Sequence, residues 1–161
     1  MPTMRERVAE LEQKRARARE MGGPERIAKH HERGKLTARE RFALLFDGGE
    51  FVEVGVHGTE MGPGADHVPA DAVVCGWGKV AGRHVAAAAY DFTVKGGSIG
   101  FVGETKVTRM RELALRCRIP MVWLIDSAGA RIDPKRNGDP DMISLFAGSG
   151  ALFFEQVAMS G

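Results

Sequence analysis

The sequence predicts an α/β fold, because segments typical of strands and helices alternate through its middle. Residues 72–80 and 83–92 are largely apolar segments of strand length, joined by Ala81-Gly82, a suitable hairpin turn. Residues 104–117 place apolar side chains on one helical face, and Pro120 ends that helix. Five apolar residues, 121–125, then indicate a strand buried on both faces. The second strand, this helix and the last strand therefore predict a right-handed βαβ unit.

Shorter elements are predicted before this unit. Residues 5–20 are rich in Glu, Arg and Lys, which indicates a solvated helix or a frayed arm, with a partner-binding helix as a further alternative. Residues 24–33 are expected to form a second short helix closed by Gly34. Thr37-Ala38-Arg39-Glu40 is a capping box that starts a third helix, with Phe42, Leu45 and Phe46 on its apolar face. Residues 51–54 alternate as a short strand, and residues 58–69 are expected to be loop.

The C-terminal part predicts one more helix. Residues 133–140 are polar loop, and Asp139-Pro140 suits a helix start. One face of that helix would carry Met142, Leu145, Phe146, Ser149, Leu152 and Phe153.

Composition excludes several classes of function. The net charge of +2 is too small to indicate a nucleic-acid partner. Cys75 and Cys117 lie in apolar patterns and are predicted to be buried thiols of a reducing compartment. No apolar run is long enough to span a membrane and no signal peptide is apparent, so a cytoplasmic location is expected.

No metal site is predicted. His30 and His31 are adjacent, so they point about 100° apart on a helix, whereas a zinc-binding helix spaces its histidines four residues apart. We therefore expect both to belong to a solvated polar face.

Two glycine-bearing segments follow the strands of the βαβ unit. The first, residues 91–100, contains Lys95, Gly96, Gly97 and Ser98, and backbone N–H groups freed by glycines can bind anions. It has neither the P-loop nor the GxGxxG spacing. The second is the turn of residues 126–130, which follows the last strand. Because ligands of such units lie beyond the carboxyl ends of the strands, the two segments are expected to be neighbours.

Several roles are open for the turn of residues 126–130. Its small residues could serve packing alone. A nucleophilic Ser127 is disfavoured, because Ile125 replaces the first glycine of a nucleophile elbow and no histidine follows. An acid/base pair of Asp126 and Asp133 has only their presence in its favour. An oxyanion pocket of backbone N–H groups, those of Ala128 and Gly129, needs only small residues in an exposed turn.

Three strings carry a resemblance to a known family: KLTARERFALLFDGGEFVEV, GWGKVAGRHVAAAAYDFTVKGGSIG and IPMVWLIDSAGARI. In this order they resemble the N-terminal domain of biotin-dependent acyl-CoA carboxyltransferases, the β subunits of propionyl-, acetyl- and methylcrotonyl-CoA carboxylases. The similarity runs from about Lys35 to Gly161. It divides the chain into a helical N-terminal arm, residues 1–34, and a partial carboxyltransferase domain, residues 35–161.

The resemblance implies a crotonase-like (ClpP/crotonase) fold, an incomplete spiral of ββα units preceded by N-terminal helices. It implies transfer of a carboxyl group from carboxybiotin, on a separate carrier domain, to the α-carbon of an acyl-CoA. The N–H groups of Ala128 and Gly129 would hold the thioester oxygen as the enolate forms, with biotin itself as the base. Lys95, Gly96, Gly97 and Ser98 would approach CoA. Implied partners are a biotin carboxylase and biotin carrier subunit, a complementary C-terminal carboxyltransferase domain, and further copies of the subunit.

The sequence departs from that family in three places. Phe101 stands where the family has Gly-Glu, residues 133–141 differ from the common loop, and the sequence stops before the family's next strand. An N-terminal piece that is inactive or nearly so by itself is therefore expected. A non-catalytic CoA-binding or assembly module is a second hypothesis. The third is an inactive fragment that exposes Leu152 and Phe153.

Overall fold

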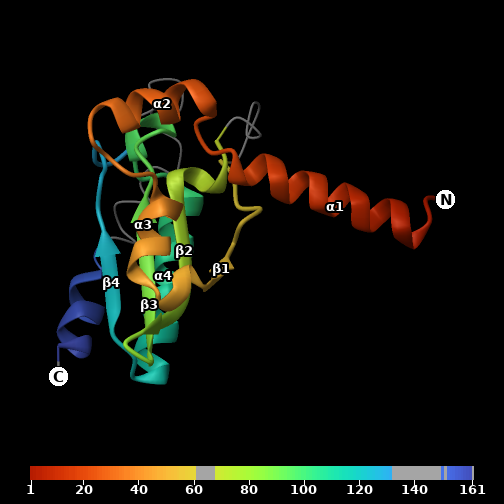
Figure 1. Cartoon of the computed structure of the whole chain (residues 1–161). Coiled ribbons are helices and arrows are strands. Elements are labelled where there is room, and N and C mark those ends of the chain that lie inside the picture. Colours follow the sequence, from red (N-terminus) through yellow and green to blue (C-terminus); the bar gives the residue numbers. More distant parts are fainter. Residues whose placement is uncertain (61–67, 132–149, 151, 161) are drawn as a thin grey trace.

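A four-stranded sheet forms the centre of the computed structural model, which describes residues 1–60, 68–131, 150 and 152–160 (Figure 1). Its strands follow the spatial order β1-β2-β3-β4. The two pairings nearest β1 are antiparallel, and β3 pairs with β4 in parallel. The strands are β1 (Phe51–Val54), β2 (Val73–Val80), β3 (Arg83–Tyr90) and β4 (Met121–Leu124).

The hairpin between β2 and β3 forms at the predicted residues. Ala81 and Gly82 have φ values of 50° and 76°. Positive φ at both central residues is the signature of a type I′ turn, whose twist matches that of the flanking strands. The register that follows pairs Val80 with Arg83.

The predicted βαβ unit is also present, with α4 (Phe101–Cys117) between β3 and β4. The helix begins at Phe101, earlier than the predicted Glu104, although Gly103 in its first turn is a poor helix former. Glycine is required there, because a Cβ atom on Gly103 would lie 2.8 Å from the Asp71 carbonyl oxygen.

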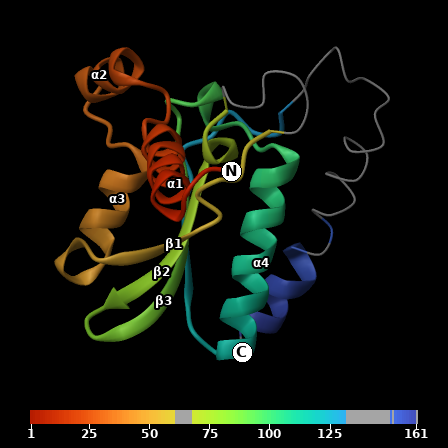
Figure 2. The same cartoon turned by 90° about the vertical axis from the view of Figure 1, so that its right-hand side faces the viewer.

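Helices cover both faces of the sheet (Figure 2). On one side lies α3 (Ala38–Leu45), which begins at the predicted capping box of Thr37 and Glu40. On the other side lies α4. The first helix, α1 (Met4–Arg19), projects away from the sheet and buries no residue, as expected of a solvated helix (Figure 1). Between α1 and α3 lies α2 (Pro24–Glu32).

One run of alanines serves both faces of the sheet. Ala87 and Ala89 join the core beneath α3, whereas Ala86 and Ala88 join the core beneath α4, and all four are fully buried. Alternation of side chains along a strand produces this division. The small side chains let a helical layer pack closely on each face.

Three predictions about burial were wrong. His30 is buried rather than solvated, because its ring stacks on Phe92 with centroids 6.1 Å apart. Cys117 is exposed, since it is the last residue of α4, one turn beyond the buried Ala114. The β4 strand is only half-buried, because within the described residues it is an edge of the sheet, and Ile125 after it is exposed.

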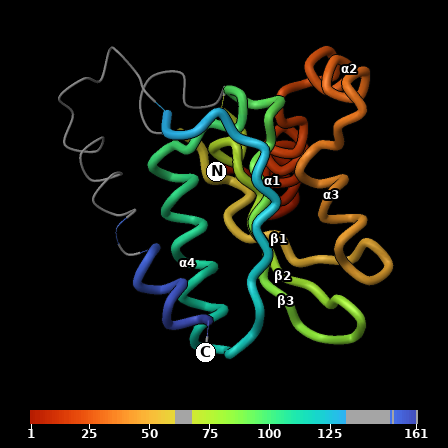
Figure 3. Tube along the Cα trace, turned by 90° about the vertical axis from the view of Figure 1, so that its left-hand side faces the viewer, coloured from red at the N-terminus to blue at the C-terminus, as the bar shows by residue number. Residues whose placement is uncertain are grey.

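A helix over residues 152–159 packs beside α4, as two views show (Figures 2 and 3). Arg111 of α4 donates to Glu155 at 2.5 Å and to Glu104 at 3.1 Å. The hypothesis of an inactive fragment expected Leu152 and Phe153 to be exposed; Phe153 is exposed, whereas Leu152 is half-buried. Residues 133–149, with the predicted loop and the start of the last helix, lie outside the described residues. Of the helices that are described, none has the length and apolar character to cross a membrane.

Candidate functional site

The two glycine-bearing segments lie against each other, as the sequence predicted. The Ala128 N–H donates to the Gly96 carbonyl at 2.9 Å, and the Ile99 N–H donates to the Gly129 carbonyl at 2.8 Å. The Arg131 N–H returns a bond to the Ile99 carbonyl at 2.9 Å. These bonds form a parallel bridge beyond the ends of β3 and β4, which fixes the turn of residues 126–130 against the loop of residues 95–99.

The contact between the segments depends on Gly97. A Cβ atom on this residue would lie 2.3 Å from the carbonyl oxygen of Asp126, closer than real Cβ contacts allow. Gly97 also has a φ of +63°, a conformation that favours glycine. Neighbouring Gly96 has the same φ, but its Cβ would have ordinary contacts, the nearest being 3.6 Å from Ala128.

Both predicted oxyanion donors have partners in the protein. The Ala128 N–H donates to the backbone carbonyl of Gly96. The Gly129 N–H donates to the hydroxyl oxygen of Ser127 at 3.0 Å. Gly129 has a φ of +98°, and apart from its chain neighbours no atom of the described residues lies within 4 Å of where its Cβ would stand. The Cα of Gly129 therefore faces space free of described atoms, and the partner of its N–H is the hydroxyl of a side chain, which can rotate away.

A buried ion pair holds the far end of the turn. The Arg131 guanidinium donates to the Asp71 carboxylate, to Ser98 Oγ at 3.1 Å and to the Ser98 carbonyl at 2.8 Å. Asp71 also accepts from the Gly103 N–H of α4 at 2.6 Å. A Cβ on Gly100 would lie 2.3 Å from the guanidinium and 2.6 Å from the carboxylate. This glycine therefore makes room for the pair.

Sequence reasoning missed Asp71 and Arg131 as parts of the site. A signal was available in the three-residue spacing of Gly97, Gly100 and Gly103, which opens one side of the chain to a close neighbour. Lys95, which the resemblance led us to expect near CoA, forms an ion pair with Glu60 at 2.6 Å. Glu60 also lies 3.4 Å from Arg131, so it links the loop to the ion pair.

The near end of the turn is held by residues of α2, of α3 and of the loop between them. Asp126 accepts from Lys35 Nζ at 2.9 Å, and the His30 ring nitrogen lies 3.7 Å from the same carboxylate. Arg41 donates to the carbonyl oxygens of Leu124, at 2.9 Å, and Tyr90. Burial lowers the pKa of Arg41, whereas Asp126 and Asp91 act to raise it. Within the described part of the chain, no cluster of side chains suits a metal ion.

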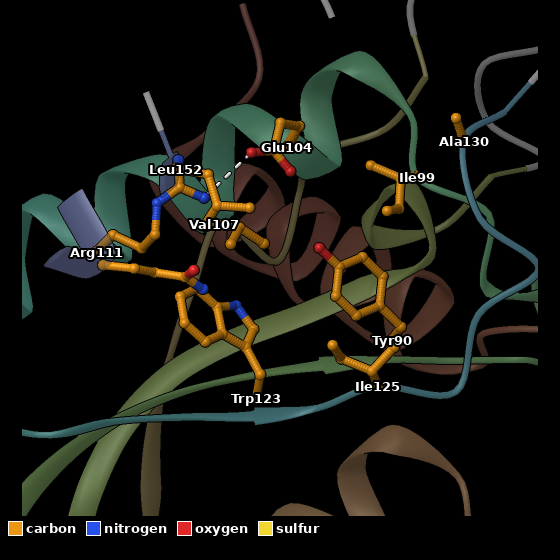
Figure 4. A pocket seen from close by; sticks show the side chains of 10 residues that line it. Tyr90, Ile99, Glu104, Val107, Arg111, Trp123, Ile125, Ala130 and Leu152 are labelled. Atoms are coloured by element: carbon orange, nitrogen blue, oxygen red, sulfur yellow. Dashed lines mark hydrogen bonds and ion pairs between the residues drawn. The ribbon is translucent and has the colours of Figure 1, made fainter. Parts of the chain in front are cut away.

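An apolar pocket of about 200 Å³ opens next to the turn, on the α4 side of the sheet (Figure 4). Tyr90, Ile99 and Ile125 lie on the side nearer Ala130, whereas Arg111 and Leu152 lie at the opposite side. Trp123 is between them. Burial raises the pKa of Tyr90, so its hydroxyl stays protonated well above neutral pH. The pocket is suited to a small apolar group.

Comparison with known proteins now identifies the family. Residues 29–161 match the carboxyl transferase domain family. The chain belongs to this family. Its relatives include the methylmalonyl-CoA decarboxylase subunit alpha of Veillonella parvula, 39% identical over the whole chain. The methylmalonyl-CoA carboxyltransferase 12S subunit of Propionibacterium freudenreichii is 42% identical over 99% of the chain. This chain covers 31% of the first relative and 30% of the second, so it spans about a third of their length.

The fold agrees with this family. The crystal structure of the transcarboxylase 12S hexamer, with methylmalonyl-coenzyme A and methylmalonic acid bound, superposes with a TM-score of 0.86 at 41% identity. The match covers 99% of this chain and 31% of the 12S chain. The predicted family and the crotonase-like fold are thereby confirmed.

Proposed function

We propose that this chain forms half of the active site of an acyl-CoA carboxyltransferase, in which the turn of residues 126–130 holds the thioester of an acyl-CoA. The observation that carries the proposal is the Gly129 N–H, whose partner is a rotatable hydroxyl, in a turn that hydrogen bonds hold beyond the ends of two parallel strands. Family membership supplies the reaction class. The division into an arm, residues 1–34, and a catalytic part, residues 35–161, belongs to the same proposal.

In this proposal the Gly129 N–H is the principal donor to the thioester oxygen. Removal of the α-proton, or of a carboxyl group on the α-carbon, places negative charge on that oxygen. A preorganised N–H at that position stabilises the enolate, and one such donor is typically worth roughly 3–4 kcal/mol of barrier. The Ser127 hydroxyl must rotate to release the Gly129 N–H. The Ala128 N–H would contribute only if its bond to the Gly96 carbonyl broke, so its first role is to hold the turn.

The same half-site suits both directions of carboxyl transfer, because carboxylation and decarboxylation of the α-carbon share the enolate. One relative of this chain is named as a decarboxylase subunit and another as a carboxyltransferase. The acyl substituent would extend into the apolar pocket beside Ala130, whose volume of about 200 Å³ favours a short chain. Lys95 to Ser98 would line the path of CoA.

Carboxybiotin, when bound, supplies the carboxyl group in this proposal. The family resemblance implies that the second oxyanion pocket, for the biotin ring, belongs to the C-terminal carboxyltransferase domain. We therefore assign biotin to the remaining carboxyltransferase domain and to a carrier subunit, with further copies of the subunit completing the enzyme. A non-catalytic CoA-binding module is the alternative, and it predicts binding without turnover.

The test combines this chain with a complementary C-terminal carboxyltransferase domain and a carboxylated biotin carrier, and measures formation of methylmalonyl-CoA from propionyl-CoA. Gly129→Pro should lower the rate roughly a hundred- to thousandfold. The matched control is Gly129→Ala. Alanine is also strained at this positive φ but keeps the backbone N–H, so this variant should retain more activity than Gly129→Pro. Equal rates in both variants would contradict the role of the Gly129 N–H. Binding of propionyl-CoA without turnover would support the alternative module.

A further inference from the structure

Lys106 of α4 is a buried cation to which the proposed function gives no role. Its ammonium group donates to the Ala70 carbonyl at 2.8 Å and to the Val73 carbonyl at 2.6 Å. No carboxylate of the described residues forms an ion pair with it. Burial lowers the pKa of Lys106, because the charged form loses contact with water. A cation is therefore kept at this position against a cost of desolvation.

The aliphatic part of Lys106 is enclosed by the segment after β1. A Cβ atom on Gly55 would lie 3.0 Å from Lys106 Cε, and one on Gly58 would lie 3.1 Å from Cδ. Glycine at these two positions lets the backbone cover the side chain closely. The place of the ammonium group is therefore fixed by packing as well as by its two hydrogen bonds.

The segment that Lys106 binds has a strained backbone. Ala70, Asp71 and Ala72 have φ values of 53°, 47° and 61°, and all three are buried. The left-handed region brings the Cβ of an L-residue close to the following carbonyl oxygen, so three successive non-glycine residues there are unfavourable. The two carbonyls bound by Lys106, those of Ala70 and Val73, stand on either side of Asp71. The ammonium group therefore holds both ends of this left-handed turn.

The left-handed turn carries a carboxylate that reaches the candidate thioester site. Asp71 accepts from the Gly103 N–H at 2.6 Å and from the Arg131 guanidinium. Gly103 and Lys106 are three residues apart, so one face of α4 binds both the side chain of Asp71 and the backbone around it. Arg131 directly follows the turn of residues 126–130. A continuous set of contacts thus runs from Lys106 to that turn.

We propose that Lys106 is a positioning residue for carboxyl transfer. Its ammonium group holds the left-handed turn at Asp71, and Asp71 through Arg131 keeps the turn of residues 126–130 in place. Without the ammonium group, the left-handed turn relaxes toward ordinary φ values and displaces the Asp71 carboxylate, and Arg131 moves with it. The Gly129 N–H then no longer points at the thioester oxygen. This inference rests on the proposed function, which it deepens by naming a residue behind the turn.

The first experiment measures amide hydrogen exchange by NMR in the full 161-residue chain. Lys106→Met keeps an unbranched side chain and removes its N–H donors. The Arg131 and Ile99 N–H groups, which bridge the turn to the loop before α4, should exchange about tenfold faster or more. The Ala86 N–H, at the opposite end of the β3–β4 pairing, should change by less than about twofold. The matched control is Lys79→Met, which removes the same charge at an exposed position of β2 and should exchange as wild type does.

A rescue variant separates this role from the simple loss of a buried side chain. Glycine adopts a positive φ without strain, so Ala70→Gly/Ala72→Gly no longer needs the ammonium group to hold the turn. Added to Lys106→Met, these two changes should bring exchange at Arg131 back to within about threefold of wild type. Absence of rescue would overturn the proposal. If Lys106→Met does not fold, Lys106→Gln replaces it, because its shorter side chain keeps N–H donors.

The second experiment measures kinetics in the enzyme completed by its C-terminal domain. Lys106→Met should lower kcat about tenfold and leave KM for propionyl-CoA within about twofold, because a displaced Gly129 N–H weakens binding of the enolate more than that of the substrate. Exchange that is unchanged, or that rises equally at Arg131, Ile99 and Ala86, would overturn the role of Lys106. Faster local exchange with an unchanged kcat would uphold Lys106 as the residue that places the turn and contradict only the proposed function.

Discussion

Arg131 and Asp71 form a buried ion pair that joins the turn after β4 to the segment before β2, 60 residues earlier in the chain. The two side chains are 9% and 0% exposed. Their remaining polar atoms bind Ser98 and the first turn of α4, so the pair connects the candidate thioester site to three parts of the fold.

Removal of this arginine should strongly destabilise the chain. Arg131→Met leaves the Asp71 carboxylate buried without a cation, which typically costs about 3–5 kcal/mol. Urea unfolding followed by circular dichroism measures the loss. Arg131→Met/Asp71→Asn should lose less than the sum of the two single variants, because both charges leave together. Arg116→Met, at an exposed position of α4, is the control and should change stability by no more than about 0.5 kcal/mol. A strictly additive double variant would contradict the coupling.

Gly97 and Gly96 provide a matched test of the contact between the two segments. Alanine at either position meets the same unfavourable φ, which costs about 1–2 kcal/mol. Only Gly97→Ala also places a Cβ against the Asp126 carbonyl, so it should cost more stability and displace the turn. Thermal unfolding and propionyl-CoA binding compare the two variants. Equal effects would show that the segments are not in close contact.

Ser127 distinguishes an oxyanion turn from a nucleophile. Ser127→Ala removes the hydroxyl that accepts the hydrogen bond of the Gly129 N–H. Because no covalent step depends on this hydroxyl, the rate of carboxyl transfer should stay within about threefold of wild type. The rate is measured in the enzyme completed by its C-terminal domain. A loss of roughly a thousandfold would instead support nucleophilic catalysis by Ser127.

Cys75 should make stability fall in alkaline solution. Burial raises the pKa of its thiol from 9.0 to about 12. Between these values the unfolded state loses a proton that the folded state keeps, so the free energy of unfolding falls as the pH rises, by up to about 1.4 kcal/mol per pH unit. Urea unfolding at pH 8 and pH 10 should show this fall in wild type and a smaller one in Cys75→Ala. Tyr90 and Lys106 titrate in both proteins, so parallel pH dependences would refute the contribution of Cys75.

The two cysteines should differ in reactivity. Cys117 is exposed at the end of α4, whereas Cys75 is buried and holds its proton at neutral pH. A disulfide reagent should therefore modify one thiol of the folded chain rapidly and the second only in denaturant. Cys117→Ser identifies the fast thiol, and rapid labelling of that variant would contradict the buried position of Cys75.

The sequence by itself determined the local elements and the place of the site. Thr37 and Glu40 define a helix start, Ala81-Gly82 defines a hairpin, and alternation divides the alanines of β3 between two faces. Each of these patterns depends on backbone geometry within a few residues, so it can be recognised in the sequence without knowledge of the tertiary structure. The succession of strand, helix and strand also placed the two glycine-bearing segments at one end of the sheet.

Only the tertiary structure decided which side chains meet there. In the tertiary structure His30 is buried against Phe92 and Cys117 is exposed. The Ala128 N–H donates to the Gly96 carbonyl, and Arg131 pairs with Asp71. These partners are far apart in the sequence or depend on where a helix ends relative to the sheet. Their pairing follows from the order of the strands and the packing of helices on both faces, neither of which any short stretch of sequence contains.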